Sequence, residues 1–88
     1  MRFKVEGTTN AAPTTTGTAT TVESASEVSV FNNSTTAYAV AILTAASGTV
    51  VGNVTMAGGE RLIIKKEPTW AIYAANAAVM LTPVNTRV

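Results

Sequence analysis

Few side chains in this chain have the chemistry needed for catalysis. The 88 residues include no His, no Cys and no Asp, so five Glu are the only side-chain carboxylates. His is the usual general base near neutral pH, and a Ser or Thr nucleophile needs an adjacent base. Zinc and iron sites normally use His or Cys ligands. We therefore expect no enzyme activity, no cofactor, and no catalytic or metal-binding residue.

One charged cluster remains, at Lys65-Lys66-Glu67. A Lys nucleophile or a phosphate contact is one interpretation of it. The other is the solvated end of a strand, where adjacent side chains face opposite sides and cannot converge on one ligand. We favour the second interpretation.

The charge distribution bears on the partners. The net charge is +1, and residues 28–59 carry no charge at all. Nucleic-acid binding needs a basic stripe, so we expect no nucleic-acid partner. The apolar run Ala37–Leu43 is far shorter than the roughly 20 residues of a membrane-spanning helix, and residues 1–6 do not resemble a signal peptide. We expect no membrane association, and an uncharged stretch of this length suggests a surface that neighbouring subunits cover.

The chain divides into two parts by composition. In residues 1–6, Met1, Phe3 and Val5 alternate with charged residues, which predicts a strand with one apolar face. Residues 7–26 are rich in Thr, and Val22 is their only large apolar residue. Such a segment buries too little surface to order itself. We therefore predict an N-terminal strand and extended Thr-rich arm at 1–26, ordered mainly by other subunits, with a flexible linker as the alternative.

Residues 27–88 are predicted to form a β-sandwich domain. Short apolar segments with β propensity alternate with turns that contain Gly, Asn or Pro. The predicted strands lie at 27–31, 37–44, 49–56, 60–66, 69–74 and 78–84. The overall prediction is an all-β fold, a small β-sandwich or barrel of about six strands. The strand at 37–44 is apolar on both faces and should be central. Gly48 should supply a positive φ in the turn before residue 49, and an Ala-rich helix at 74–81 is the main local alternative.

Two aromatic residues are candidates for ligand contact. Trp70 and Tyr73 could form a platform on which a sugar or a base stacks. Because they are three residues apart, a strand would place them on opposite faces. We favour one core residue and one surface residue, and keep both as candidate interaction residues.

Residues 28–84 resemble a known group of proteins. They read V-x-V-F-N-N-S-T-T, an apolar strand, A-A-S-G-T-V-V-G-N-V-T-M-A-G-G-E, then R-L-I-I-K-K-E-P-T and an alternating strand that ends in T-P-V. This order resembles small β-rich virion structural proteins of tailed phages, particularly of marine cyanophages. The resemblance implies an assembly role in the phage particle, after synthesis in the host cytoplasm. It supplies no catalytic residues.

The expected function is that of a non-catalytic virion structural protein. A capsid decoration (cement) protein that stabilises the shell is the first hypothesis, with a tail, neck or fibre accessory protein as the alternative. A carbohydrate-binding β-sandwich that uses Trp70 or Tyr73 is a further alternative. The expected partners are other virion proteins, namely the major capsid protein or tail and neck proteins, and further copies of the chain. Met1, Phe3 and Val5 are the predicted docked face, through pairing of their strand with a neighbour.

Overall fold

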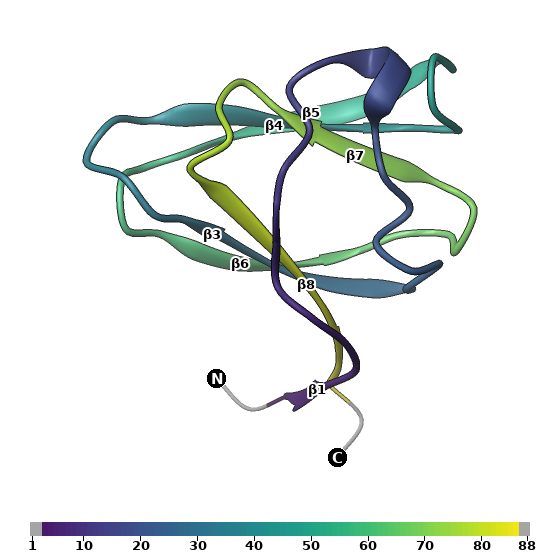
Figure 1. The fold of residues 1–88 in the computed structure, drawn as a ribbon, viewed down its shortest axis with the longest axis horizontal. Coiled ribbons are helices and arrows are strands. Elements are labelled where there is room, and N and C mark those ends of the chain that lie inside the picture. The colour runs from purple at the N-terminus through teal and green to yellow at the C-terminus, as the bar shows by residue number, and fades with distance from the viewer. Residues whose placement is uncertain (1–2, 87–88) are drawn as a thin grey trace.

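The protein folds into two antiparallel β-sheets that face each other (Figure 1). The structure is a computed structural model and describes residues 3–86. It confirms the predicted all-β class, and the two separate sheets make it a sandwich rather than a closed barrel. In chain order the elements are β1 (Lys4–Val5), β2 (Asn10–Ala11), the short 3-10 helix η1 (Thr16–Thr18), β3 (Glu27–Asn32), β4 (Tyr38–Leu43), β5 (Val50–Met56), β6 (Arg61–Lys65), β7 (Ala71–Ala74) and β8 (Val79–Asn85).

The larger sheet has five strands. Its order is β1-β8-β3-β6, and β2 also pairs with β8. Pro83 lies within β8, although proline has no N–H for a sheet ladder. Its carbonyl accepts the Glu6 N–H at 2.8 Å, and the N–H and C=O of a strand residue point to the same side. The Pro83 nitrogen, which carries no hydrogen, therefore faces the gap between the short strands β1 and β2. No continuous partner strand lies there that would need a hydrogen bond from it.

The smaller sheet has the order β5-β4-β7. The central position of β4 confirms the prediction from its two apolar faces, and its Val40, Ala41 and Leu43 are buried. The turn between β4 and β5 differs from expectation, because Ser47 has the positive φ of 60° and Gly48 does not. Gly48 is needed for space instead, since a Cβ there would lie 2.7 Å from the Thr44 hydroxyl oxygen.

A single hydrophobic core fills the space between the sheets. Its members come from both sheets and from the N-terminal segment: Ala12, Val22, Val28, Val30, Val40, Met56, Ile72, Ala74, Val79 and Leu81. On β6, Leu62 and Ile64 pack against this core. The helix considered at 74–81 is wrong, because Val79 already begins β8 and pairs with Asn32 of β3.

Residues 7–26 pack against the sandwich of their own chain. After β2, the Pro13 carbonyl accepts the Ala74 N–H at 2.9 Å, and Thr20 and Ile72 exchange two backbone hydrogen bonds of 3.0 and 2.7 Å. In Figure 1 this segment crosses the open side between the sheets, and η1 lies above the smaller one. Ala12 and Val22 are only 3% and 6% exposed. Ordering by other subunits is therefore not required, because backbone bonds to the edges of β7 and β8 replace the large apolar groups that this segment lacks.

The strand predicted at 1–6 is shorter in the structure. Within the described residues it comprises Lys4 and Val5, which pair with Asn85 and Val84 of β8. Across residues 3–86 no helix has both the length and the apolar character needed to cross a membrane.

Candidate interaction surface

The outer face of the five-stranded sheet carries side chains that the core does not use. On β3, Val28 and Val30 point inward and are fully buried, so alternation turns Ser29 and Phe31 outward. Phe31 pairs with Met80 of β8 on one side and with Arg61 of β6 on the other. An aromatic ring, a thioether and a guanidinium therefore lie next to one another on this face.

Arg61 is held in place on this face by two contacts. Its guanidinium carbon lies 5.0 Å from the centroid of the Phe31 ring, which is within the range of a cation–π interaction. Its Nη1 also donates a hydrogen bond to the hydroxyl of the buried Ser29. The orientation of Arg61 is thus fixed before any partner binds.

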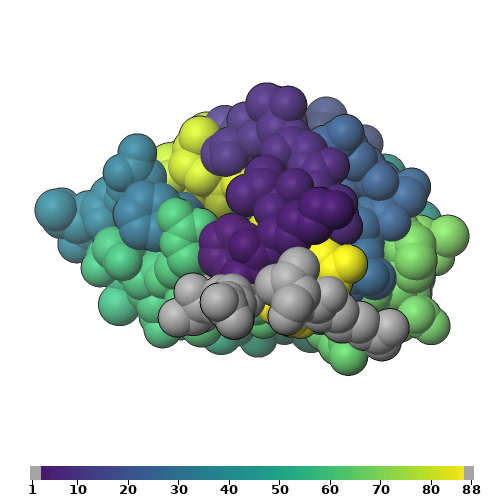
Figure 2. All heavy atoms as spheres, turned by 90° about the horizontal axis from the view of Figure 1, so that it is seen from below, coloured from purple at the N-terminus to yellow at the C-terminus, as the bar shows by residue number. Residues whose placement is uncertain are grey.

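The N-terminal residues complete a hollow of about 310 Å³ on this face. Phe3 and Val5 line it, together with Thr9, Phe31, Arg61, Met80 and Thr82. A hydrogen bond of 2.6 Å between the hydroxyls of Thr9 and Thr82 holds the N-terminal segment against β8. Figure 2 views the molecule from this side, with the N-terminal residues in purple lying across its middle. We call this hollow the outer-face hollow.

The predicted interaction residues separate into two groups. Phe3 and Val5 both line the outer-face hollow, and Val5 is 58% exposed. Met1 lies outside the described residues. Tyr73 is on β7 of the other sheet and pairs with Ala41. Trp70 lies in the turn before β7, where its backbone N–H donates to the Glu67 carbonyl. Both aromatic side chains are half-buried, and neither lines the outer-face hollow.

Sequence reasoning missed the partners of Phe3 and Val5 in this hollow. Phe31 was detectable, because Val28 and Val30 fix the inward face of its strand and place Phe31 on the other one. Arg61 was detectable in the same way, because Leu62 and Ile64 point inward on its strand and alternation places Arg61 on the outer face. The pairing of β3 with both β6 and β8 brings these side chains together, and that pairing is not visible in the local pattern.

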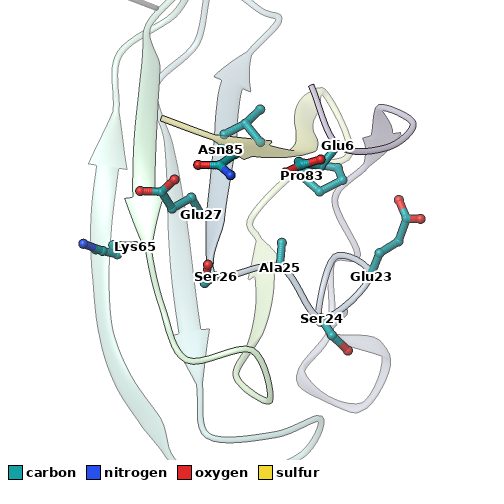
Figure 3. A pocket seen from close by; sticks show the side chains of 10 residues that line it. Glu6, Glu23, Ser24, Ala25, Ser26, Glu27, Lys65, Pro83 and Asn85 are labelled. Atoms are coloured by element: carbon teal, nitrogen blue, oxygen red, sulfur yellow. The ribbon is translucent and has the colours of Figure 1, made fainter. Parts of the chain in front are cut away.

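A second hollow, of about 370 Å³, is polar. Glu6, Glu23, Glu27 and Lys65 contribute its charged side chains (Figure 3). The Glu27 carboxylate accepts hydrogen bonds from the N–H and the hydroxyl of Thr86, at 2.7 and 2.8 Å. In Figure 3 the Glu side chains come from separate segments, and Lys65 points away from Glu23. No group of three or more carboxylate, His or Cys side chains in residues 3–86 is placed to hold a metal ion.

Lys66 has a structural role that the sequence did not suggest. It is only 5% exposed, and its Nζ donates to the carbonyls of Thr21 and Ala25 at 2.9 and 2.6 Å. Burial lowers the pKa of its ammonium group below the ordinary value of 10.5. The interpretation of the charged cluster as a solvated strand end is wrong for Lys66, although Lys65 is exposed.

The loop held by Lys66 has an unusual backbone. Val22, Glu23 and Ser24 have φ values of 54°, 58° and 60°, in the left-handed region that residues other than Gly seldom adopt. The two carbonyls bound by Lys66 lie on either side of these three residues. Lys66 therefore fixes a strained loop against the sandwich.

In comparisons with known proteins, no family model, no curated protein and no solved structure matches the chain.

Proposed function

We propose that this chain is a non-catalytic virion structural protein of the capsid decoration (cement) type, which binds the phage shell through the outer-face hollow. The virion context comes from the resemblance of residues 28–84 to small phage structural proteins. The absence of His, Cys and Asp from the sequence supports a non-catalytic role.

The composition of the outer-face hollow is the observation that carries this proposal. Protein interfaces are enriched in aromatic residues, Met and Arg, and hot spots favour aromatic and Arg side chains. The hollow combines Phe3, Phe31, Met80 and Arg61 on one face of a rigid sheet. Because Ser29 and Phe31 already orient Arg61, less side-chain entropy is lost when a partner binds.

The main partner is the major capsid protein. A segment of it that places an apolar side chain over Phe31 and Met80, and a carbonyl or carboxylate beside Arg61, would match the chemistry of the hollow. β1 lies at the end of the sheet order, so its outer edge can add main-chain hydrogen bonds to such a segment.

The experiment is an add-back assay on particles that lack the protein. Purified wild-type protein is added, and its occupancy on the particles is measured as a function of concentration. Two variants, Met80→Lys and Phe3→Ser, should each bind at least about ten-fold more weakly, since a hot-spot residue contributes about 2 kcal/mol or more. Ala39→Lys is the matched control, because Ala39 is exposed on the other sheet.

Substitutions are preferable to deleting residues 1–26, because that deletion removes Ala12 and Val22 from the core. Circular dichroism checks that each variant folds. Wild-type occupancy for both hollow variants, or no binding of the wild type, would contradict the proposal. An image of the decorated particle distinguishes a shell position from the alternative position on tail, neck or fibre.

A further inference from the structure

The four outer edges of the two sheets are protected to different degrees. β1 and β2 cover the edge of β8, and the segment from Pro13 to Thr20 covers the edge of β7. β6 has no outer partner among the described strands, but it carries the charges of Arg61 and Lys65. Charged side chains, Lys above all, are a common way to prevent an edge strand from pairing. Within residues 3–86 no strand covers the outer edge of β5, and β5 carries no charge.

β5 has the properties of a strand that pairs with another chain. Its seven residues, Val50–Met56, include no charged side chain, and all but Met56 are exposed. Val50, Val51 and Val54 are 46%, 48% and 38% exposed and are among the most exposed large apolar residues described. The register shifts at Val51, and beyond it residues 52–56 form a regular, uncharged edge of the kind that favours strand addition.

The direction of the free backbone groups follows from the bonds of β4. The Ala39 carbonyl accepts the Ala75 N–H on the side of β7, at 2.9 Å. Ala39 therefore directs its main-chain groups away from β5, and its partner Thr55 forms a non-hydrogen-bonded pair with it. The same alternation applies to Ala41 and its partner Asn53. The N–H and C=O groups of Asn53 and Thr55 consequently point outward from the free edge.

We propose that β5 pairs with β5 of a second copy of this chain, antiparallel, about a two-fold axis at Asn53. Antiparallel pairing of one strand with its own copy is compatible with a closed two-fold dimer. An edge that carried charge would place like charges close together in such a dimer, and β5 carries none. The result is a continuous six-stranded sheet across the two copies.

The register centred on Asn53 also gives matching side chains. It places Val54 of one copy opposite Gly52 of the other, on the same face of the joined sheet. A Cβ at Gly52 would meet no atom within 4 Å, so this position has open space beside the exposed Val54. Each copy thus supplies both an apolar side chain and the space that receives it.

The size of the contact sets the expected strength. A single pair of seven-residue strands covers less than the roughly 800 Å² per partner of a standard stable interface. The dimer should therefore depend on concentration and become favourable where many copies gather. This inference does not rest on shell binding, because the β5 edge shares no residue with the outer-face hollow.

Sedimentation velocity between about 1 µM and about 1 mM, a range that brackets weak associations, is the first test. The wild type should shift from monomer to dimer as concentration rises. Asn53→Pro removes an outward N–H without removing a bond to β4, and Val51→Lys adds a charge to the edge. Each should raise the dissociation constant about ten-fold or more, because desolvating a charge at the edge or losing a main-chain bond opposes association. The control Ala39→Lys adds the same charge to the same sheet, away from the edge, and should dimerise as the wild type does.

Cysteine cross-linking tests the register. The chain has no cysteine, so Asn53→Cys introduces a single thiol. In the proposed dimer the two copies of residue 53 are directly opposite, with Cα atoms about 5.5 Å apart, within the range of a disulfide. Thr55→Cys places its two thiols four residues apart along the strands, roughly 13 Å, and should not cross-link under the same oxidising conditions.

Each outcome decides the proposal. A dimer that both edge variants weaken, together with cross-linking at residue 53, supports it. A monomer at every concentration, or a dimer weakened by Ala39→Lys and not by the edge variants, overturns it. Cross-linking at residue 55 and not at residue 53 overturns the register. Circular dichroism of each variant separates lost pairing from lost folding. Failure of the add-back assay with an intact dimer would count against shell binding alone.

Discussion

Replacing Lys66 by Met tests whether this buried ammonium holds the N-terminal segment on the sandwich. Met keeps much of the length and apolar character of the Lys stem but has no donor. The substitution leaves the carbonyls of Thr21 and Ala25 without the hydrogen bonds that they accept from Nζ. It also leaves the loop at Val22–Ser24 to keep its left-handed backbone unaided.

The expected loss of stability follows from the hydrogen-bond geometry. The bonds of 2.9 and 2.6 Å are strong, whereas the contact of 3.4 Å with the Glu67 carbonyl adds little. Hydrogen bonds to a charged group contribute about 1.5–3 kcal/mol each. Part of this loss of stability is offset, because the substitution also removes the desolvation of the ammonium, which opposes folding. We expect a net loss of about 2–4 kcal/mol, and a Tm lower by about 10 °C or more in a domain of this size.

Urea denaturation followed by Trp70 fluorescence measures this change, and Lys65→Met is the matched control. Lys65 is the adjacent residue and is exposed, so its replacement should change the stability by less than about 0.5 kcal/mol. Equal effects of the two substitutions, or a change below about 0.5 kcal/mol for Lys66→Met, would refute the anchoring role. Limited proteolysis within residues 7–26 should accelerate in Lys66→Met only.

The same residue gives a pH dependence with a defined sign. Burial lowers the pKa of Lys66 below 10.5 in the folded state. Between the lowered pKa and 10.5, the unfolded chain binds more protons than the folded one, so stability rises with pH in that window. A neutral amine still has two N–H groups for the two short bonds. The stability difference between wild type and Lys66→Met should therefore widen as pH rises toward 10.5, and a narrowing difference would show that the ammonium form is required.

Three further substitutions test other parts of the fold by chemical denaturation. Asn32 Nδ2 donates to three carbonyls. Asn32→Ala removes this donor and should lower the free energy of unfolding by about 2–3 kcal/mol. The control Asn33→Ala changes an exposed residue and should have little effect. Gly58→Ala should lower the free energy of unfolding by about 1–3 kcal/mol through overpacking, because its Cβ would lie 2.7 Å from backbone atoms. Gly52→Ala should change it little, because a Cβ there meets open space. Ser24→Gly should be neutral or stabilising by up to about 1 kcal/mol, because Gly adopts the positive φ without strain.

The sandwich was predictable because its strands follow the two-residue period closely. Val28 and Val30 identify the inward face of β3, and the two apolar faces of β4 identify a central strand. The residues Ala57-Gly58-Gly59 are typical of a turn between two strands, and Gly59 has a φ of 77°. Local sequence carries this information because burial acts on each side chain separately.

The role of residues 7–26 was not predictable by the same reasoning. The segment is held by backbone hydrogen bonds to sheet edges and by two small core contacts, Ala12 and Val22. Neither backbone bonding nor long-range packing leaves a periodic signal in side-chain hydrophobicity. Lys66 shows the same limit, because its carbonyl partners are 45 and 41 residues away in sequence.

The placement of the two proposed contact surfaces has a consequence for assembly. The outer-face hollow belongs to the five-stranded sheet, whereas the β5 edge belongs to the three-stranded sheet. Pairing at β5 therefore leaves Phe31 and Met80 available in both copies. A dimer would present two hollows to one shell, and the second contact would form at a high effective concentration. Weak pairing at β5 can thus increase shell occupancy without any additional contact to the shell. Val51→Lys should therefore make the curve of particle occupancy against protein concentration shallower, while the affinity of a single hollow stays unchanged.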